Sequence, residues 1–174
     1  AQSTKHVVGL PTSMGGSGDT SPMTGLGVYL GMKACAKSVW GSDSLSERVV
    51  AMQGFGHVGI QTAKHLTKEG AKLLVTDVHG EARRKAQSLG ATLVAPEDIY
   101  ETPCDIFSPC ALGGVLNSDT IPRLNCTIVA GGANNQLLND KDGDALQKRG
   151  ILYGPDYIIN AGGIINVACE MNGT

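Results

Sequence analysis

A glycine-rich turn at residues 54–59 is the feature that most constrains what this chain can fold into. Its six residues follow the pattern GxGxxG and are Gly54, Phe55, Gly56, His57, Val58 and Gly59. An apolar run, 49–52, precedes the turn, and a segment with helical apolar spacing, 57–69, follows it. In such a strand–turn–helix unit, the first glycine permits the tight turn, the second leaves space for a pyrophosphate and the third lets helix and strand pack closely. The turn therefore predicts a dinucleotide-binding unit.

A carboxylate follows the turn where such folds hold a ribose. Asp77 ends the apolar run 73–76 and lies 23 residues after Gly54, so it can accept hydrogen bonds from both ribose hydroxyls of an adenosine. Its charge would repel the extra phosphate of NADP, and NAD is the expected cofactor. Arg83 and Arg84 could reach such a phosphate, but they are typical of a solvated helix face. The glycine turn could instead serve packing, with Asp77 as a helix N-cap, and taken alone it leaves flavin or S-adenosylmethionine open.

Apolar runs and helical segments alternate along the whole chain. The expected strands are 49–52, 73–76, 93–94, 105–107, 127–130 and 151–153. The expected helices are 22–40 with Ser21 as N-cap, 57–69, 81–89, a short one begun by Pro96, 140–148 and one after Asn160. This alternation implies parallel strands joined by crossovers, with helices on both faces. The fold class expected is α/β, a doubly wound, mostly parallel sheet of the Rossmann type.

Length and charge limit the number of domains and the kinds of partner that the chain can have. The 174 residues fit one domain, so we interpret 1–174 as a single dinucleotide-binding domain. The net charge of −2 provides no basic footprint for nucleic acid. The longest nearly apolar stretch, 157–169, is interrupted by Asn160 and Asn166 and is shorter than the ~18 residues of a spanning helix, so no membrane contact is expected.

The cysteines and histidines predict neither disulfides nor a metal site. The five cysteines are odd in number and form no CxxC pair, and the four histidines do not cluster with them at zinc spacing. We expect reduced thiols in the cytoplasm and no bound metal.

Five motifs, in order along the chain, resemble one protein family. They are GGSGDTSPMTGLGVYLGMKA (15–34), the glycine turn, DIFSPCALGGVLN (105–117), AGGANNQL (130–137) and PDYIINAGGIINVACE (155–170). They resemble the cofactor domain of the glutamate, leucine, phenylalanine and valine dehydrogenases, most of all the leucine, phenylalanine and tryptophan branch. The resemblance covers nearly the whole chain. It implies oxidative deamination of an L-amino acid to its 2-oxo acid, with hydride passed to NAD and ammonium released.

The resemblance also implies roles for residues near the cofactor. Thr24 matches a threonine that bonds the nicotinamide carboxamide, although a first-turn threonine can also satisfy its own helix backbone. Cys110 and Ala111 lie beyond the strand 105–107, where small residues suit a wall beside the adenosine ribose. The alternative for Cys110 is an inert buried thiol.

Further matches lie toward the end of the chain. Asn135 matches an asparagine between nicotinamide and substrate, although loop asparagines are commonly turn formers. Asn160 matches an asparagine near the nicotinamide and would also suit a helix N-cap. Ile164 and Val167 match residues that line the pocket for the substrate side chain, although with Met171 they could form a core-facing stripe. Because no cation here could pair a glutamate carboxylate, an apolar side chain, aliphatic or aromatic, is expected.

Two catalytic groups of the family have no counterpart in this sequence. The substrate-activating lysine of a GGxK-type motif and an aspartate belong to a separate N-terminal domain. We therefore expect a cofactor domain without catalytic residues or activity of its own, whose complete enzyme binds NAD(H) and an amino acid or 2-oxo acid and forms a homo-oligomer. The alternatives are a stand-alone NAD(H)-binding regulatory or redox-sensing module and an inert structural domain that keeps its glycines for packing.

Overall fold

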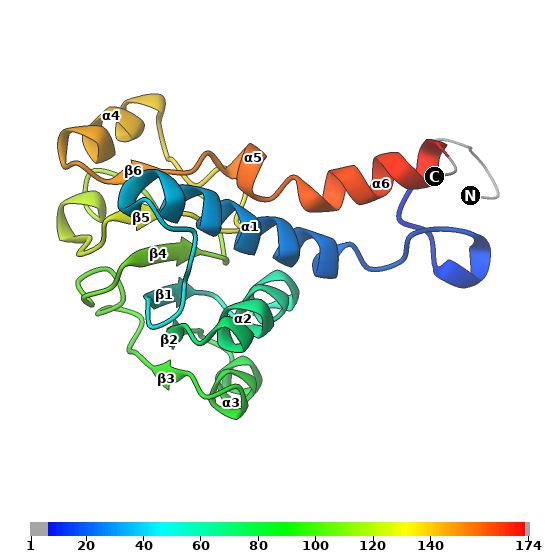
Figure 1. Cartoon of the computed structure of the whole chain (residues 1–174), viewed down its shortest axis with the longest axis horizontal. Helices are drawn as coiled ribbons and strands as arrows, with labels where there is room; N and C mark the ends of the chain where they lie inside the picture. Colours follow the sequence, from blue (N-terminus) through cyan, green and yellow to red (C-terminus); the bar gives the residue numbers. More distant parts are fainter. Residues whose placement is uncertain (1–6, 173–174) are drawn as a thin grey trace.

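The computed structural model describes residues 7–172 and is built on one parallel sheet (Figure 1). Its strands are β1 (Val49–Gln53), β2 (Lys72–Thr76), β3 (Thr92–Leu93), β4 (Ile106–Pro109), β5 (Ile128–Val129) and β6 (Leu152–Tyr153). The six strands lie in the order β3-β2-β1-β4-β5-β6, and every neighbouring pair is parallel. This doubly wound order confirms the predicted fold class and puts the reversal of strand order between β1 and β4. The predicted domain also includes residues 1–6 and 173–174, which lie outside the described residues.

The helices agree closely with the predicted segments. They are α1 (Ser21–Trp40), α2 (His57–Glu69), α3 (Gly80–Ser88), α4 (Asp140–Lys148), α5 (Asp156–Ile159) and α6 (Gly162–Asn172), with 3-10 turns η1 (Thr12–Met14) and η2 (Ile121–Arg123). Ser21 is the first helical residue of α1 and Thr20 is its N-cap, one residue before the position expected. Asp19 Oδ1 accepts the N–H of Ser21 at 2.9 Å, so this carboxylate satisfies an N–H of the first turn.

The short helix expected from Pro96 is absent from the described structure, where residues 96–102 form turns. The N–H of Asp98 donates to Ala95, and the carbonyl of Asp98 accepts from Glu101 and Thr102. The hydrogen bonding stops there, because Pro103 follows and has no N–H to continue it. This prediction was wrong because a proline at a helical start does not ensure that a helix propagates.

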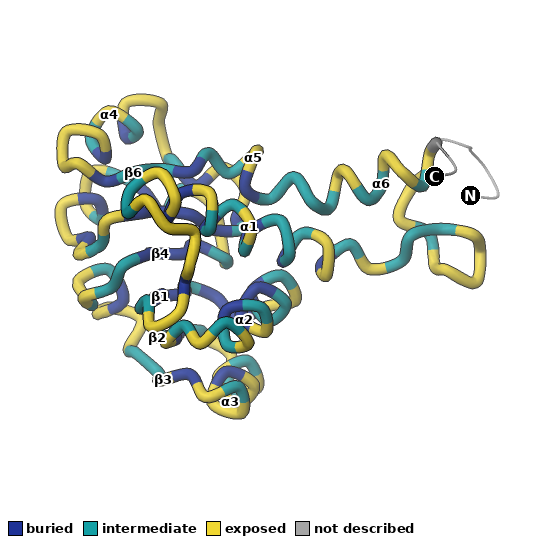
Figure 2. The backbone as a smooth tube through the Cα atoms, in the orientation of Figure 1, coloured by how far each residue is buried: buried dark blue, intermediate teal, exposed yellow. Residues whose placement is uncertain are grey.

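Each face of the sheet has its own apolar core. Successive side chains of a strand point to opposite faces, so Val50 and Met52 lie in one core and Ala51 in the other. The first core includes buried residues of α1, α2 and α3, and the second includes residues of η2 and α4. Figure 2 shows the buried backbone concentrated in the strands and on the inner sides of α1 and α2.

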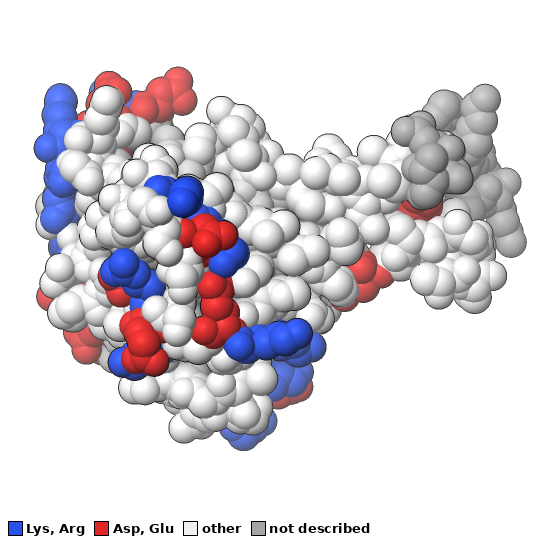
Figure 3. All heavy atoms as spheres, viewed as in Figure 1, with Lys and Arg blue, Asp and Glu red and all other residues white. Residues whose placement is uncertain are grey.

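Helix α6 and the first half of α1 form an arm that extends from the sheet (Figure 1). The two helices lie very close together, because a Cβ on Gly162 would be 2.0 Å from the carbonyl oxygen of Met23. Near the tip, the carboxylate of Glu170 accepts from Gly9 N–H, Ser17 N–H and Ser17 Oγ at 3.0, 3.0 and 2.6 Å. Figure 3 shows charged side chains gathered on the body, while the visible face of the arm is largely uncharged.

Candidate functional site

The three glycines of the turn between β1 and α2 face different surroundings. Gly54 has a φ of +96°, and a Cβ there would lie 2.7 Å from Cβ of Ala111. A Cβ on Gly59 would lie 2.9 Å from the carbonyl oxygen of Gly54. Gly56 is exposed, its φ is −78°, and no heavy atom lies within 4 Å of its Cβ position. Backbone conformation and packing therefore explain the first and third glycines, whereas the second leaves open space.

The start of α2 provides hydrogen-bond donors toward that space. Gly56 is the N-cap of α2 and makes no side-chain capping bond. The N–H groups of a first helical turn have no partner within the helix, and the helix dipole makes this end favourable for negative charge. An uncapped helix start beside an open glycine is suited to a phosphate group.

Asp77 lies at the carboxyl end of β2 and faces the glycine turn. Its Oδ2 accepts the N–H of Phe55 at 2.7 Å, and its Oδ1 accepts the N–H of His79 at 2.8 Å. His79, not Asp77, is the N-cap of α3, so the alternative of a capping role for Asp77 is wrong. A carboxylate has about four acceptor positions, which leaves capacity for a ligand.

A hollow of about 490 Å³ opens between the ends of β1, β2 and β4, and we call it the Asp77 hollow. Its lining includes Gly54, Gly56, Asp77, Val78, Cys110 and Ala111. Burial raises the pKa of the Cys110 thiol, and its Sγ lies 3.4 Å from Oγ of Ser108. Cys110 is thus a neutral thiol in the wall of the hollow. Arg83 and Arg84 are exposed on α3, as a solvated helix face requires.

A second hollow of about 730 Å³ lies on the other side of the α2 start, and we call it the Asn160 hollow. Its lining includes Thr24, Val58, Asn135, Asn160, Ile164 and Val167. These residues come from α1, α2, the loop after β5, α5 and α6. Most of the predicted site residues thus line one of two hollows at the carboxyl edge of the sheet. The linings include neither His57 nor Gly59, nor Phe55, whose side chain is buried in the first core.

Two polar side chains in the Asn160 hollow have defined partners. Asn160 Nδ2 donates to Asn134 Oδ1 at 2.6 Å and to the carbonyl of Gly132 at 3.5 Å. Asn160 is the C-cap of α5, and Ala161 separates it from α6, so the N-cap role for α6 is not observed. Thr24 Oγ1 donates to the carbonyl of Thr20 at 3.0 Å. This is the alternative role, in which a threonine of the first turn binds the backbone of its own helix. Thr24 nevertheless borders the hollow.

The apolar residues of α6 do not face a core. Ile164 and Met171 are each 71% exposed, whereas Val167 is partly buried. This excludes the core-facing stripe for Ile164 and Met171, and it leaves Ile164 and Val167 as an uncharged wall of the Asn160 hollow.

Asp156 and Asn134 also border the Asn160 hollow, although the sequence reasoning gave them no role. Both lie in quoted motifs, and each follows a strand, β6 for Asp156 and β5 for Asn134. Their positions after strands of a parallel sheet could have marked both residues as candidates for the site, because ligands bind at that edge of the sheet.

Residues 7–172 contain neither a metal-binding cluster nor a membrane-spanning helix. No group of three or more His, Cys, Asp or Glu side chains there could hold a metal ion. No helix in the same range is long and apolar enough to span a bilayer.

Fold and strand order together define an α/β domain of the Rossmann type. A sequence model of the Glutamate/Leucine/Phenylalanine/Valine dehydrogenase family matches residues 15–87 and 75–174. The chain belongs to this family, and a nicotinamide dinucleotide is the class of cofactor that membership supports.

Similarity to individual proteins extends along the chain. The chain is 54% identical over 173 residues to leucine dehydrogenase from Thermoactinomyces intermedius. The alignment covers 99% of this chain and 47% of that protein. The crystal structure of L-tryptophan dehydrogenase from Nostoc punctiforme aligns with a TM-score of 0.86 and 50% identity, over 90% of this chain and 48% of the other. The hetero-hexameric glutamate dehydrogenase from Thermus thermophilus aligns with a TM-score of 0.78 and 27% identity, over 96% and 44%. The chain spans about half the length of these relatives.

Proposed function

We propose that this chain is the NAD(H)-binding part of an L-amino-acid dehydrogenase that acts on apolar substrates. The complete reaction converts an L-amino acid and water into a 2-oxo acid and ammonium. Bound NAD would accept the hydride released in this oxidation. Family membership supports the reaction class, and the residues of the two hollows support the assignment of the cofactor.

The observation that carries the proposal is the open space at Gly56. Neither the backbone angle of Gly56 nor protein packing requires a glycine there, because its φ is negative and no heavy atom lies within 4 Å of the Cβ position. A glycine is required, however, if a ligand approaches the backbone at this point. The uncapped start of α2 beside it favours a negatively charged group, which fits the pyrophosphate of a dinucleotide.

The residues around the turn would hold the two halves of the cofactor in different hollows. Asp77 would accept the ribose hydroxyls in the Asp77 hollow, with Cys110 and Ala111 as neighbouring wall, and its charge favours NAD over NADP. Thr24, Asn135 and Asn160 would orient the nicotinamide half in the Asn160 hollow through hydroxyl and amide groups. This orientation presents one face of the ring to the substrate.

The lining of the Asn160 hollow supports an apolar substrate. Ile164 and Val167 form one side, and neither Lys nor Arg occurs among the described residues that line it. Asp156 adds a negative charge to the same lining. A substrate carboxylate on the side chain would be buried without a cationic partner, which is costly. We therefore propose that Ile164 and Val167 contact an aliphatic or aromatic substrate side chain.

Assembly and location complete the proposal. We propose a homo-oligomer for the complete enzyme. The hetero-hexameric glutamate dehydrogenase of Thermus thermophilus supports assembly into an oligomer, and the identity of the subunits is part of the proposal. All five cysteines are free thiols, which supports a reducing compartment such as the cytoplasm.

Calorimetric titration of NADH into the chain and into Gly56→Val tests the proposal. We expect wild type to bind and the variant to bind at least about tenfold more weakly, because the new side chain occupies the approach of the pyrophosphate. Gly143→Val is the matched control, since Gly143 lies on α4 and its Cβ position meets only Leu137 Cδ1, at 3.6 Å. Equal binding by folded Gly56→Val and wild type would contradict the assignment. A much higher affinity for NADH than for NAD would favour a redox sensor instead.

A further inference from the structure

The loop after β5 has an unusual backbone conformation where it borders the Asn160 hollow. Asn135 has a φ of +51°, and the described residues contain one other non-glycine with positive φ, Glu47. Asparagine adopts the left-handed region more readily than other non-glycine residues, yet it is still less favourable there than in the common regions and persists where its surroundings hold it. The interactions that hold Asn135 in this conformation therefore determine the shape of the loop where it borders the Asn160 hollow.

Contacts from the 113–114 backbone hold one side of the loop. The carbonyl of Asn135 accepts the N–H of Gly114 at 2.7 Å. A Cβ on Gly113 would lie 2.7 Å from the carbonyl oxygen of Asn134 and 2.8 Å from that of Asn135. The loop is thus pressed closely against this backbone.

Helix α5 holds the other side of the loop through Asp156. Asp156 Oδ2 accepts the N–H of Asn135, and its Oδ1 lies 3.4 Å from the hydroxyl of Tyr153. Burial and the charge of Asp156 raise the pKa of Tyr153 to about 12, so the phenol remains a donor to the carboxylate. Tyr153 thereby orients the group that fixes the N–H of Asn135.

The same short helix also holds the preceding residue. Asn160, the C-cap of α5, donates to Asn134 Oδ1 at 2.6 Å, so the side chains of the first residue and of the C-cap of α5 bind two consecutive residues of the loop. Asp156 and Asn160 are four residues apart and face the same hollow. A change at Asp156 would therefore alter the loop and the Asn134–Asn160 contact together.

We propose that Asp156 is a positioning residue for the nicotinamide half of the cofactor. Its carboxylate keeps Asn135 left-handed and keeps the Asn134–Asn160 pair aligned, without itself contributing to the Asp77 hollow. This inference rests on the proposed function. It predicts that Asp156 affects binding of the nicotinamide moiety and leaves binding of the adenosine moiety unchanged.

Parallel titrations with NADH and ADP-ribose test the inference, because ADP-ribose has no nicotinamide. We expect Asp156→Ala to weaken NADH binding about tenfold, the scale of one hydrogen bond to a charged group, and to change ADP-ribose binding by less than about twofold. Asp156→Asn retains an acceptor oxygen and should restore most of the NADH affinity. Asp140→Ala, an aspartate in the first turn of α4, is the control and should behave as wild type.

The possible outcomes separate this inference from the proposed function. An equal loss of affinity for both ligands in Asp156→Ala, or no loss for either, would overturn the positioning role while leaving cofactor binding established. Failure of Asp156→Asn to recover NADH affinity would also count against it. A wild-type chain that binds neither ligand would overturn the proposed function, and the inference with it.

Discussion

Asp77 connects the glycine turn to the loop that begins α3. Its two oxygens accept backbone N–H groups of Phe55 and His79, so its position is fixed before any ligand arrives. A preorganised carboxylate loses little freedom on binding and therefore discriminates well between ligands. We therefore expect Asp77 to determine the preference between NAD and NADP.

Asp77→Asn should relax the preference for NAD over NADP. The substitution retains one acceptor oxygen but removes the charge that would repel a 2′-phosphate. We expect the ratio of NAD to NADP affinity to fall by about tenfold or more, mainly through weaker NAD binding, because a bond to a charged acceptor is replaced by a neutral one. Competition of each dinucleotide against NADH provides the measurement. An unchanged ratio would mean that other groups, such as the exposed Arg83 and Arg84, decide the preference.

The positions of individual residues could be predicted where a sequence pattern fixes the local backbone. The glycine turn and Asp77 could be placed from the strand–turn–helix order, because each position in that unit has a defined steric requirement. The contact between Asn134 and Asn160 could not, since it depends on how α5 crosses the end of β5. The contact between Asp156 and Asn135 could not be predicted for the same reason, as the two residues lie 21 positions apart in sequence.

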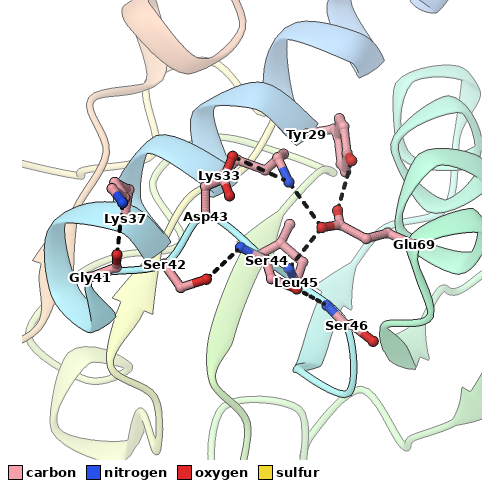
Figure 4. A network of polar contacts seen from close by, with 10 residues as sticks. All are labelled: Tyr29, Lys33, Lys37, Gly41, Ser42, Asp43, Ser44, Leu45, Ser46 and Glu69. Atoms are coloured by element: carbon pink, nitrogen blue, oxygen red, sulfur yellow. Dashed lines mark hydrogen bonds and ion pairs between the residues drawn. The ribbon is translucent and has the colours of Figure 1, made fainter.

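At the scale of elements, α2 is anchored at its C-terminal end by a network around Glu69 (Figure 4). Glu69 accepts from Tyr29 Oη at 2.7 Å, Lys33 Nζ at 2.9 Å and the N–H of Leu45 at 3.0 Å. Lys33 also pairs with Asp43 at 3.6 Å. The network joins α1, the loop after it and α2, so it holds the helix whose other end begins at the glycine turn.

The protonation state of Glu69 links this anchor to pH. Burial favours the protonated carboxyl, but the hydrogen bonds from Leu45, Tyr29 and Lys33 outweigh it and lower the pKa of Glu69 below its ordinary value of 4.5. A carboxyl with a lowered pKa in the folded state stabilises the fold above its unfolded pKa. This contribution is lost as the pH falls through the folded-state pKa.

Glu69→Gln should destabilise the chain at neutral pH and much less in acid. We expect a loss of about 2 kcal/mol in the free energy of unfolding at pH 7, since a partly buried charged acceptor with three donors is replaced. The difference from wild type should shrink as the pH falls below the ordinary glutamate pKa of 4.5 and through the lowered pKa of folded Glu69. Urea unfolding of both proteins across this range is the measurement.

Glu81→Gln is the matched control for this experiment. Glu81 pairs with Lys85 on the surface of α3 with its side chain 71% exposed, so its removal should leave the free energy of unfolding unchanged within experimental error. A difference between wild type and Glu69→Gln that stays constant or grows in acid would show that the Glu69 network does not provide the stabilisation.

Element-level prediction worked best for long segments with strong periodicity. Helices α2 and α4 have the predicted bounds. An apolar stripe and the C-cap Gly70 define α2, whereas a capping box of Asn139 and Asp142 defines the start of the charged helix α4. The segment after Pro96 had a start signal without a sustained stripe, and it forms turns. Helix α6 was predicted, but periodicity could not reveal that Ile164 and Met171 face outward, because a stripe identifies a shared face and not what that face contacts.

At the scale of the whole molecule, the carboxyl edge of the sheet carries the Asp77 hollow and the Asn160 hollow on either side of the glycine turn. The opposite edge carries a separate groove of about 740 Å³, whose lining includes Ala71, Lys72 and Pro103. The groove lies at the amino ends of the strands, where parallel α/β sheets do not bind their ligands. The central claim is that one dinucleotide spans both hollows and leaves this groove empty.

Chemical-shift mapping of backbone amides during titration with NADH tests that claim most directly. The account predicts saturable shifts at Gly54–Gly59, around Asp77 and at Asn135 and Asn160, with ADP-ribose reproducing only the shifts at the turn and the Asp77 hollow. Shifts confined to the groove beside Ala71 and Pro103, or no shifts at millimolar NADH, would contradict it.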